Sequence, residues 1–224
     1  MGSPPEYTCS LNFTKVLALE PSTTEGEIKP DCWTVAFGNS YNDEERCIAA
    51  GYDNGDVKLF DLRSNSLRWD TNLMNGVCHL EFDRKDIKMN KLMATTLEGT
   101  IQLFDMRTYH VEQGYACLKN RNSNSAATMW GVKHLPQNRD IFCTMGGDGG
   151  LSLYQYKYPQ QRTIKDADGR DKGVVGHLEL LNDRVLSTQP VCAFDWHPEK
   201  IGLSVLACLD QTCKIAIVTK LNLY

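Results

Sequence analysis

Long hydrophobic runs are scarce in this 224-residue chain. Residues 205–209 form one of the longest, far short of the ~20 apolar residues that a transmembrane helix needs. Residues 16–19 are too few for the core of a signal peptide, and no basic segment precedes them. We therefore expect neither a membrane protein nor a secreted one, and place the chain in the cytoplasm.

Positive charge is also limited. The chain carries 24 Lys and Arg against 28 Asp and Glu, a formal net charge of −4, and the basic residues form no stripe. Proteins that bind nucleic acids or acidic membranes usually concentrate positive charge on one surface. This balance argues against both kinds of partner.

Paired cysteine motifs are missing. The nine cysteines are an odd number, and none belongs to a Cys-x-x-Cys pair. Such cysteines favour buried thiols in a reducing compartment over disulfides or a zinc site. Seven of them fall inside expected strands: Cys32, Cys47, Cys78, Cys143, Cys192, Cys208 and Cys213.

Catalytic motifs are absent as well. The five histidines are scattered, and we expect His134 to be a solvated residue beside a turn. The glycine-rich run 146–150 lacks the Gly-Lys-Ser/Thr ending of a phosphate-binding loop, and no Gly-x-Ser-x-Gly elbow occurs. The sequence therefore predicts no enzyme activity, no catalytic residues, no cofactor and no metal.

A turn followed by a strand recurs along the chain. In the first copy, Asp53-Asn54-Gly55 supplies a turn in which glycine adopts a positive backbone angle, and residues 57–61 then alternate as a strand. Equivalent stretches surround Gly99, Gly149 and, more weakly, Gln211. Two strands precede each copy at matching offsets. The farther ones are expected at 32–37, 77–82, 129–134 and 191–196, and the nearer ones at 46–51, 91–96, 140–146 and 204–208. Weaker candidates lie at 15–19, 67–71, 114–118 and 177–181.

Four strands per repeat are typical of WD-type β-propeller blades. We predict an all-β fold with about four blades in residues 13–224. The approximate repeats are 13–63, 64–107, 108–156 and 177–220, with a long surface loop at 157–176 and a disordered or fraying segment at 1–12. An unrelated antiparallel β-sandwich would not explain the recurrence. Four blades form either a complete ring or part of a larger propeller, and an open array would leave surfaces that tend to associate.

Candidate interaction residues follow the last strand of two consecutive repeats. Asp61-Leu62-Arg63 and Asp105-Met106-Arg107 repeat the same pattern. Arginine is a frequent interface anchor because its planar guanidinium offers five donors. We predict that Asp61, Arg63, Asp105 and Arg107 bind a partner; the alternative is that they only stabilise their own turns.

The aromatic residues divide into two expected groups. Trp33 and Trp130 occupy equivalent positions in their repeats, and we expect both in the core together with Phe104. Trp69 and Tyr109 follow the two Asp-x-Arg triplets, so we expect them to be more exposed.

Several runs resemble one family. They are Asp31-Cys32-Trp33-Thr34-Val35-Ala36-Phe37-Gly38 and segments 50–56, 59–63, 75–78, 80–87, 134–139, 186–190 and 217–222. They are similar to the family of WD repeat-containing protein 92 (Monad), which comprises axonemal dynein assembly factors. The resemblance covers about residues 15–224 and implies a seven-bladed propeller of which this chain holds the C-terminal part. It also implies dynein heavy chains as partners, together with RuvB-like ATPase and prefoldin-like co-chaperone subunits, and an older association with apoptosis.

The leading hypothesis is thus a non-enzymatic interaction scaffold. A rival is the substrate receptor of a cullin-type ubiquitin ligase, because such WD proteins carry Asp-x-Arg after the final strand of consecutive repeats. Phe60 and Phe104 stand where those receptors usually have tryptophan, which weakens this alternative. A propeller hydrolase is a third and less favoured reading.

Overall fold

The computed structural model describes residues 18–19, 28–39, 42, 44–121 and 127–224. The expected fraying segment 1–12 and most of the expected strand at 15–19 lie outside these residues. No helix in the described part of the chain is long and apolar enough to cross a membrane.

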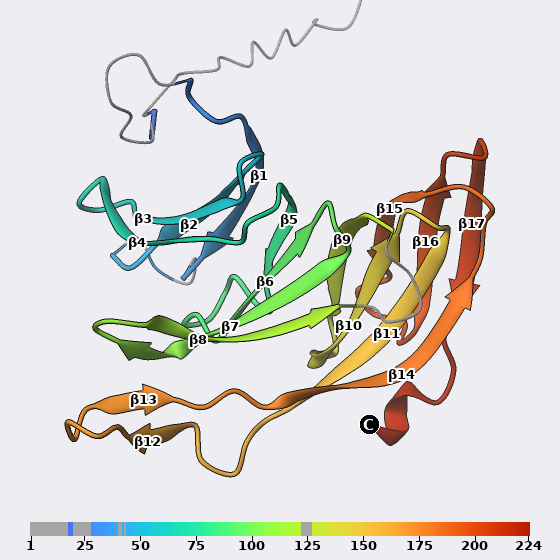
Figure 1. The fold of residues 1–224 in the computed structure, drawn as a ribbon. Helices are drawn as coiled ribbons and strands as arrows, with labels where there is room; N and C mark the ends of the chain where they lie inside the picture. Colours follow the sequence, from blue (N-terminus) through green and yellow to red (C-terminus); the bar gives the residue numbers. More distant parts are fainter. Residues whose placement is uncertain (1–17, 20–27, 40–41, 43, 122–126) are drawn as a thin grey trace, which may run out of the picture.

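Antiparallel sheets make up the fold, and they follow one another in chain order (Figure 1). The first sheet holds β1 (Cys32–Gly38), β2 (Cys47–Tyr52), β3 (Asp56–Asp61) and β4 (Ser66–Asn72). The second holds β5 (Val77–Phe82), β6 (Lys91–Thr96), β7 (Thr100–His110) and β8 (Gly114–Arg121). In both, each strand pairs with the next along the chain, so each sheet is a simple meander.

The third sheet departs from this pattern. It holds β9 (Met129–Leu135), β10 (Asn138–Gly146) and β11 (Gly150–Lys157), but its outer strand is β14 (His177–Val185). A separate hairpin of β12 (Thr163–Lys165) and β13 (Asp171–Gly173) lies between them in sequence. Within the expected surface loop 157–176, the chain therefore forms regular structure, and β13 packs against β7 and β8 (Figure 1).

The fourth sheet has three strands: β15 (Val191–Trp196), β16 (Leu203–Cys208) and β17 (Thr212–Ile217). A short 3-10 helix, η1 (Leu221–Leu223), follows and buries Leu221 against this sheet and the third. The first and fourth sheets lie at opposite ends of the row (Figure 1).

The all-β class is confirmed, and so are the expected strands from residue 32 onward. The bounds of β5, β6 and β15 are the ones that the sequence predicts. The sheets are offset from the sequence repeats: the strands at 67–71, 114–118 and 177–181 begin or precede a repeat but pair with the sheet before it, as β4, β8 and β14.

Apolar side chains between successive sheets form the core. One cluster joins the first and second sheets, a second joins the second and third, and another joins the third and fourth. The first strands contact one another in the order β1, β5, β9 and β15. Phe60, Phe104 and Tyr154, which are equivalent in the repeats, are all buried, as we expected for Phe104.

The recurrent turn has the backbone conformation that its glycine suggested. Gly55, Gly99 and Gly149 have φ of 92°, 69° and 82°. Gln211, at the equivalent place in the fourth sheet, has φ of 68°. The turn geometry is therefore kept even where a side chain makes it unfavourable.

Some burial expectations are wrong. Trp33 and Trp130 are 48% and 44% exposed, and Trp69 is buried. Trp69 makes edge contacts with Phe104 and Tyr115 at centroid distances of 5.2 and 5.1 Å, because β4 turns it toward the second sheet. Trp33 lies at a β-bulge of β1, and its ring is next to Gly76 in the loop between β4 and β5. Tyr109 is exposed, as expected.

The cysteine expectation holds in part. The described cysteines form no disulfide, and Cys47, Cys143 and Cys208 are buried. Burial raises the pKa of the Cys47 thiol to about 11, which makes it unreactive. Cys32, Cys192 and Cys213 are exposed, contrary to expectation; they lie on β1, β15 and β17, in the first and fourth sheets.

Candidate functional site

In each Asp-x-Arg triplet, the aspartate carboxylate accepts hydrogen bonds from backbone N–H groups of its own turn. Asp61 Oδ1 accepts hydrogen bonds from the backbone N–H groups of Arg63 at 2.8 Å and Ser64 at 3.2 Å. These bonds hold the pKa of Asp61 below its usual range. Asp105 Oδ1 accepts the N–H of Arg107 at 3.0 Å. Both aspartates thus fix the chain direction after β3 and within β7.

The two arginines differ in what they contact. Arg107 donates through Nε to the Met89 carbonyl at 2.7 Å and through Nη2 to the Lys88 carbonyl at 3.2 Å. Its guanidinium ties β7 to the loop that precedes β6. The Arg63 side chain is exposed, and its guanidinium makes no hydrogen bond within the described residues. Of the two, Arg63 is the one whose donors remain available to a partner.

A third arginine, which sequence reasoning left inside a surface loop, engages Asp105. Arg162 donates to Asp105 Oδ2 through Nε at 2.9 Å, and its Nη2 pairs with Oδ1. The same guanidinium donates to Asn90 Oδ1 at 3.2 Å and lies over the Tyr158 ring, 5.2 Å from its centroid. Asp105 is only 1% exposed. The structure therefore uses Asp105 internally, and it is not accessible to a partner.

A buried lysine lies next to this pair. Lys91, at the start of β6, is fully buried; its Nζ pairs with Asp140, donates to the Tyr158 hydroxyl at 2.8 Å and lies 3.6 Å from Asp83 Oδ2. Tyr158 in turn donates to Asp140 Oδ1 at 3.0 Å. This network joins the second sheet to the third. Nothing in the local sequence separates Lys91 from an ordinary surface lysine, so only the structure reveals it.

His134 is also buried, and the expectation of a solvated histidine is wrong. Its ring Nδ1 and its backbone N–H both lie 2.8 Å from Glu81 Oε2. Because Glu81 is an acceptor, the ring donates from Nδ1. Burial raises the pKa of Glu81, but the hydrogen bond and charge of His134, with Lys133 nearby, outweigh burial and lower it overall. The pair links β5 to β9, and this structural role accounts for the buried histidine.

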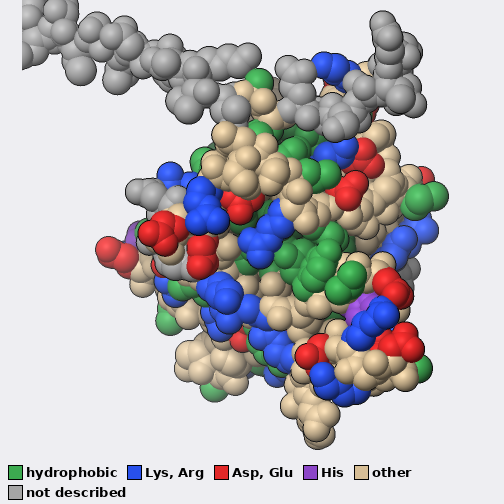
Figure 2. Space-filling view, turned by 90° about the vertical axis from the view of Figure 1, so that its left-hand side faces the viewer, with side chains coloured by type: hydrophobic (Ala, Val, Ile, Leu, Met, Phe, Trp, Pro, Cys, Tyr) green, Lys and Arg blue, Asp and Glu red, His purple; other side chains and the backbone are tan. Residues whose placement is uncertain are grey.

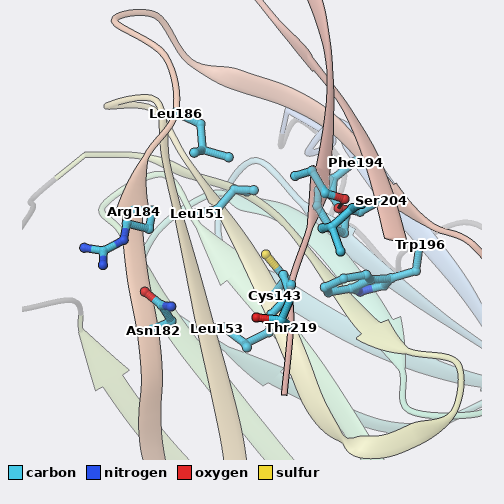
Figure 3. A pocket seen from close by; sticks show the side chains of 13 residues that line it. Cys143, Leu151, Leu153, Asn182, Arg184, Leu186, Phe194, Trp196, Ser204 and Thr219 are labelled. Carbon is cyan, nitrogen blue, oxygen red and sulfur yellow. Dashed lines mark hydrogen bonds between the residues drawn. The ribbon is translucent and has the colours of Figure 1, made fainter. Parts of the chain in front are cut away.

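A groove opens between the third and fourth sheets (Figure 3). Its volume is about 300 Å³. Figure 3 shows Asn182 and Arg184 of β14 on one side, Phe194 and Trp196 of β15 on the other, and leucines of β11 between them. Its lining residues are Cys143, Leu151, Leu153, Asn182, Arg184, Leu186, Phe194, Trp196, Ser204, Ala216, Ile217, Val218 and Thr219. Sequence reasoning did not identify this groove.

These features offer surfaces for binding. The charged groups beside Asp105 are paired with one another, and the groove is mainly apolar with one amide and one guanidinium on its rim. On the side shown in Figure 2, Lys and Arg side chains border a hydrophobic patch. Protein interfaces commonly combine an apolar centre with a polar rim, and arginine is enriched in them.

Comparison with known proteins gives strong similarities in sequence. No family model matches the chain. The chain is 58% identical over 209 residues to Dynein axonemal assembly factor 10 of Xenopus laevis and 58% identical over 207 residues to that of Homo sapiens. It is 54% identical over 207 residues to the Chlamydomonas reinhardtii protein. These alignments cover 92–93% of this chain but 57% of each relative.

Solved structures share the fold at low identity. The chain resembles the computationally designed protein Ika4 with a TM-score of 0.54 and 17% identity, over 88% of this chain and 96% of that one. It resembles the designed protein Ika8 with a TM-score of 0.56 and 17% identity, over 87% of this chain and 48% of that one. These matches concern the fold alone. The chain spans a little more than half of the length of the dynein axonemal assembly factors named above. Over that region it is their homologue.

Proposed function

We propose that this chain is part of an axonemal dynein assembly factor and acts in the cytoplasm as a non-enzymatic scaffold for protein partners. The observation that carries the proposal is the 54–58% identity to proteins named Dynein axonemal assembly factor 10, over more than nine-tenths of the chain. Identity at this level extends through the sheets, so the relatives' fold and surfaces are expected here too.

The fold supports a scaffold role. Four antiparallel sheets packed in series agree with blades of a WD-repeat β-propeller, the architecture that the recurrent turn predicts. Dynein heavy chains, RuvB-like ATPase subunits and prefoldin-like subunits are the partners that the family resemblance suggests. Arg63 is the best placed of the four candidate residues to contact one of them, because its guanidinium is exposed.

The ubiquitin-ligase alternative has less support. It needs both Asp-x-Arg triplets as a docking surface, yet Asp105 pairs with Arg162 and Arg107 binds backbone carbonyls. The names of the relatives give it no support either.

A chimera tests the proposed function. In Chlamydomonas cells without their own relative, we would express that relative with its matching region replaced by this chain. Isolated flagella should then regain axonemal dynein heavy chains, quantified by mass spectrometry, to the level given by the intact relative. A chimera that is stably expressed but leaves the flagella without these heavy chains would contradict the proposal.

Two matched variants of the chimera separate binding from folding. Arg63→Ala should reduce dynein recovery without lowering the amount of chimera in the cell. Arg107→Ala should lower stability first, because it removes two bonds to the loop before β6. Equal recovery with Arg63→Ala would remove this residue from the interface.

A further inference from the structure

The first strand of every sheet carries a bulge near its start. In its pairing with the second strand, the first strand skips one residue, which is Trp33 in β1, Cys78 in β5, Trp130 in β9 and Cys192 in β15. A bulge turns a side chain out of the regular alternation, and bulges are common beside functional sites. Two of the four side chains that are turned out in this way are tryptophans.

A recurrent backbone hydrogen bond fixes where these bulges lie. In each sheet, the hairpin between the second and third strands donates an N–H to the C=O just before the first strand, at 2.8–3.0 Å. The donor and acceptor pairs are Asp53 with Asp31, Leu97 with Gly76, Gly147 with Thr128, and Leu209 with Pro190. The bulges therefore lie beside the hairpins of the recurrent turn. We call this end of the sheets the turn end.

The starts of successive first strands also lie side by side. Thr34, directly after the bulge of β1, accepts the Leu80 N–H through Oγ1 at 3.1 Å. His79, at the equivalent place in β5, accepts the Val132 N–H through Nδ1 at 3.4 Å. Both bonds join corresponding positions of neighbouring sheets. The turn ends of the first three sheets therefore form one surface.

Large apolar side chains are exposed on this surface. Trp130 and Leu97 are 44% and 36% exposed, although the third and second sheets each pack against a sheet on both sides. Trp33 reaches across to the second sheet: a Cβ on Gly76 would lie 2.9 Å from its ring carbon Cζ3 and 3.0 Å from Leu97 Cδ1. The exposure of Trp130 and Leu97 therefore does not come from a missing neighbouring sheet.

Carboxylates lie close to the contact of Trp33 with Leu97. Asp31 is two residues before Trp33, and its N–H donates to Asp53 Oδ1 at 2.9 Å. Glu98 directly follows Leu97, is exposed, and makes no ion pair within the described residues. This part of the turn end is therefore both aromatic and acidic.

The second tryptophan has a similar setting in the third sheet. A Cβ on Gly147 would lie 3.4 Å from Trp130 Nε1, and the exposed Asp148 directly follows Gly147. Asp148 is equivalent to Glu98 in the repeats. Each tryptophan at a bulge thus lies near a hairpin that carries an exposed carboxylate.

Cations at the turn end do not balance these carboxylates. Lys58 and Lys214 pair with aspartates of their own hairpins. Arg121 and Arg184 lie on the outer strands β8 and β14, which are the strands farthest from the bulges. Lys29, before β1, has a partner of its own. The charge around the tryptophans therefore favours a cationic ligand.

From these observations we propose that the turn end binds a peptide segment of a partner protein in which Lys or Arg stands next to an apolar residue. The apolar residue packs on Leu97 and Trp33, and the cation lies against an indole face and pairs with Glu98. Indole faces attract cations, and tryptophan is enriched among the residues that dominate binding. Arg63 follows β3 at the opposite end of the sheets, so this is a second docking surface.

A random peptide library tests the chemistry of the ligand. Phage-displayed peptides of about twelve residues, which span about 40 Å when extended, are selected on the immobilised 224-residue chain. We expect enrichment of peptides with Lys or Arg beside an apolar residue, and their binding should weaken with added salt. Enrichment of acidic or purely apolar peptides overturns the proposal. So does a native chain that enriches no more than the Trp33→Ala, Trp130→Ala double variant.

Single substitutions then place the most enriched peptide. By fluorescence anisotropy, Trp33→Ala and Glu98→Lys should each raise the dissociation constant at least about tenfold, as expected for residues at the centre of an interface. Glu98→Gln, which removes only the charge, should give a smaller increase. Tyr109→Ala and Glu199→Lys alter an exposed aromatic residue and an exposed carboxylate at the opposite end, and should leave the dissociation constant unchanged.

Glu98→Lys is the decisive variant, because the Glu98 side chain makes no contact that folding needs. Circular dichroism should show the native fold for it, even if Trp33→Ala lowers stability. Unchanged affinity with Glu98→Lys would overturn the proposal. An equal loss with Glu199→Lys would show that only the net charge of the chain matters, and the proposal would be wrong.

Discussion

Arg162 pairs with Asp105 across 57 residues of sequence. The arginine belongs to the segment between β11 and β14, and the aspartate is buried in β7 of the neighbouring sheet. This contact holds the β12–β13 hairpin beside the second sheet. His110, which is buried at the end of β7, reinforces it through Asp166 at 3.1 Å.

The first prediction concerns this pair. Arg162→Ala should lower the free energy of unfolding by about 2–3 kcal/mol, because it leaves the buried Asp105 carboxylate without its cation. Urea denaturation measures the loss, and hydrogen exchange should show faster exchange in residues 163–173.

Arg170 provides the control. It pairs with Glu112, but both side chains are about half exposed or more. Arg170→Ala should therefore cost no more than about 1 kcal/mol. Equal losses for the two variants would mean that burial of Asp105 does not decide the effect.

The second prediction concerns Phe104. Phe104→Ala should cost about 3–5 kcal/mol, because it opens a cavity beside Trp69 at the contact of the first two sheets. Tyr109→Ala, at an exposed aromatic residue of the same strand, should cost less than about 1 kcal/mol. Thermal unfolding of the native chain and of the two variants compares their stabilities. A loss below about 1 kcal/mol for Phe104→Ala would show that this ring is not a core residue.

The third prediction concerns the turn in the fourth sheet. Gln211 has φ of 68°, which glycine adopts without steric cost. Gln211→Gly should raise the free energy of unfolding by about 0.5–1 kcal/mol, since relief of strain exceeds the added freedom of the unfolded chain. Gly169 has φ of 77°, and a side chain there would meet open space. Gly169→Gln is therefore the reciprocal change. This change should lower the free energy of unfolding. If Gln211→Gly lowered it and Gly169→Gln raised it, the strain argument would be refuted.

The fourth prediction concerns acid stability. The pKa of Glu81 is lowered in the folded protein, so its contribution is present above the unfolded pKa and is lost as pH falls through the folded one. Between about pH 6 and about pH 3 the native chain should lose more unfolding free energy than Glu81→Gln does. Glu179→Gln, at an exposed carboxylate, should behave as the native chain. Parallel pH curves for native protein and Glu81→Gln would exclude Glu81 as a source of acid sensitivity.

Alternation made most of the strands predictable. The runs that became β5 and β15 carry apolar residues at every second position, and turn residues stand beside them, whereas β6 is predicted by its offset from the recurrent turn. The recurrent glycine turn then placed equivalent strands in successive sheets. These signals are local, so they survive in the sequence without knowledge of the neighbouring sheets.

The site was less predictable because it depends on distant contacts. The triplets around Asp61 and Asp105 read alike, but Arg162 reaches only Asp105. Trp33 and Trp69 were assigned to the wrong environments, because which face of a sheet is buried depends on the sheet beside it. The periodicity of the sequence does not show which face a neighbouring sheet will cover.

The separation of β11 from β14 affects how the chain assembles in time. Outer strands β4 and β8 follow their partners after residues 62–65 and 111–113, whereas β14 joins β11 only after residues 158–176. Closing the longer loop costs roughly 1.5 kcal/mol more in entropy, by the logarithmic dependence on loop length. The first two sheets can form from neighbouring segments, so the third is expected to complete last during folding. The hairpin that Arg162 anchors would then set the slow step of the whole chain.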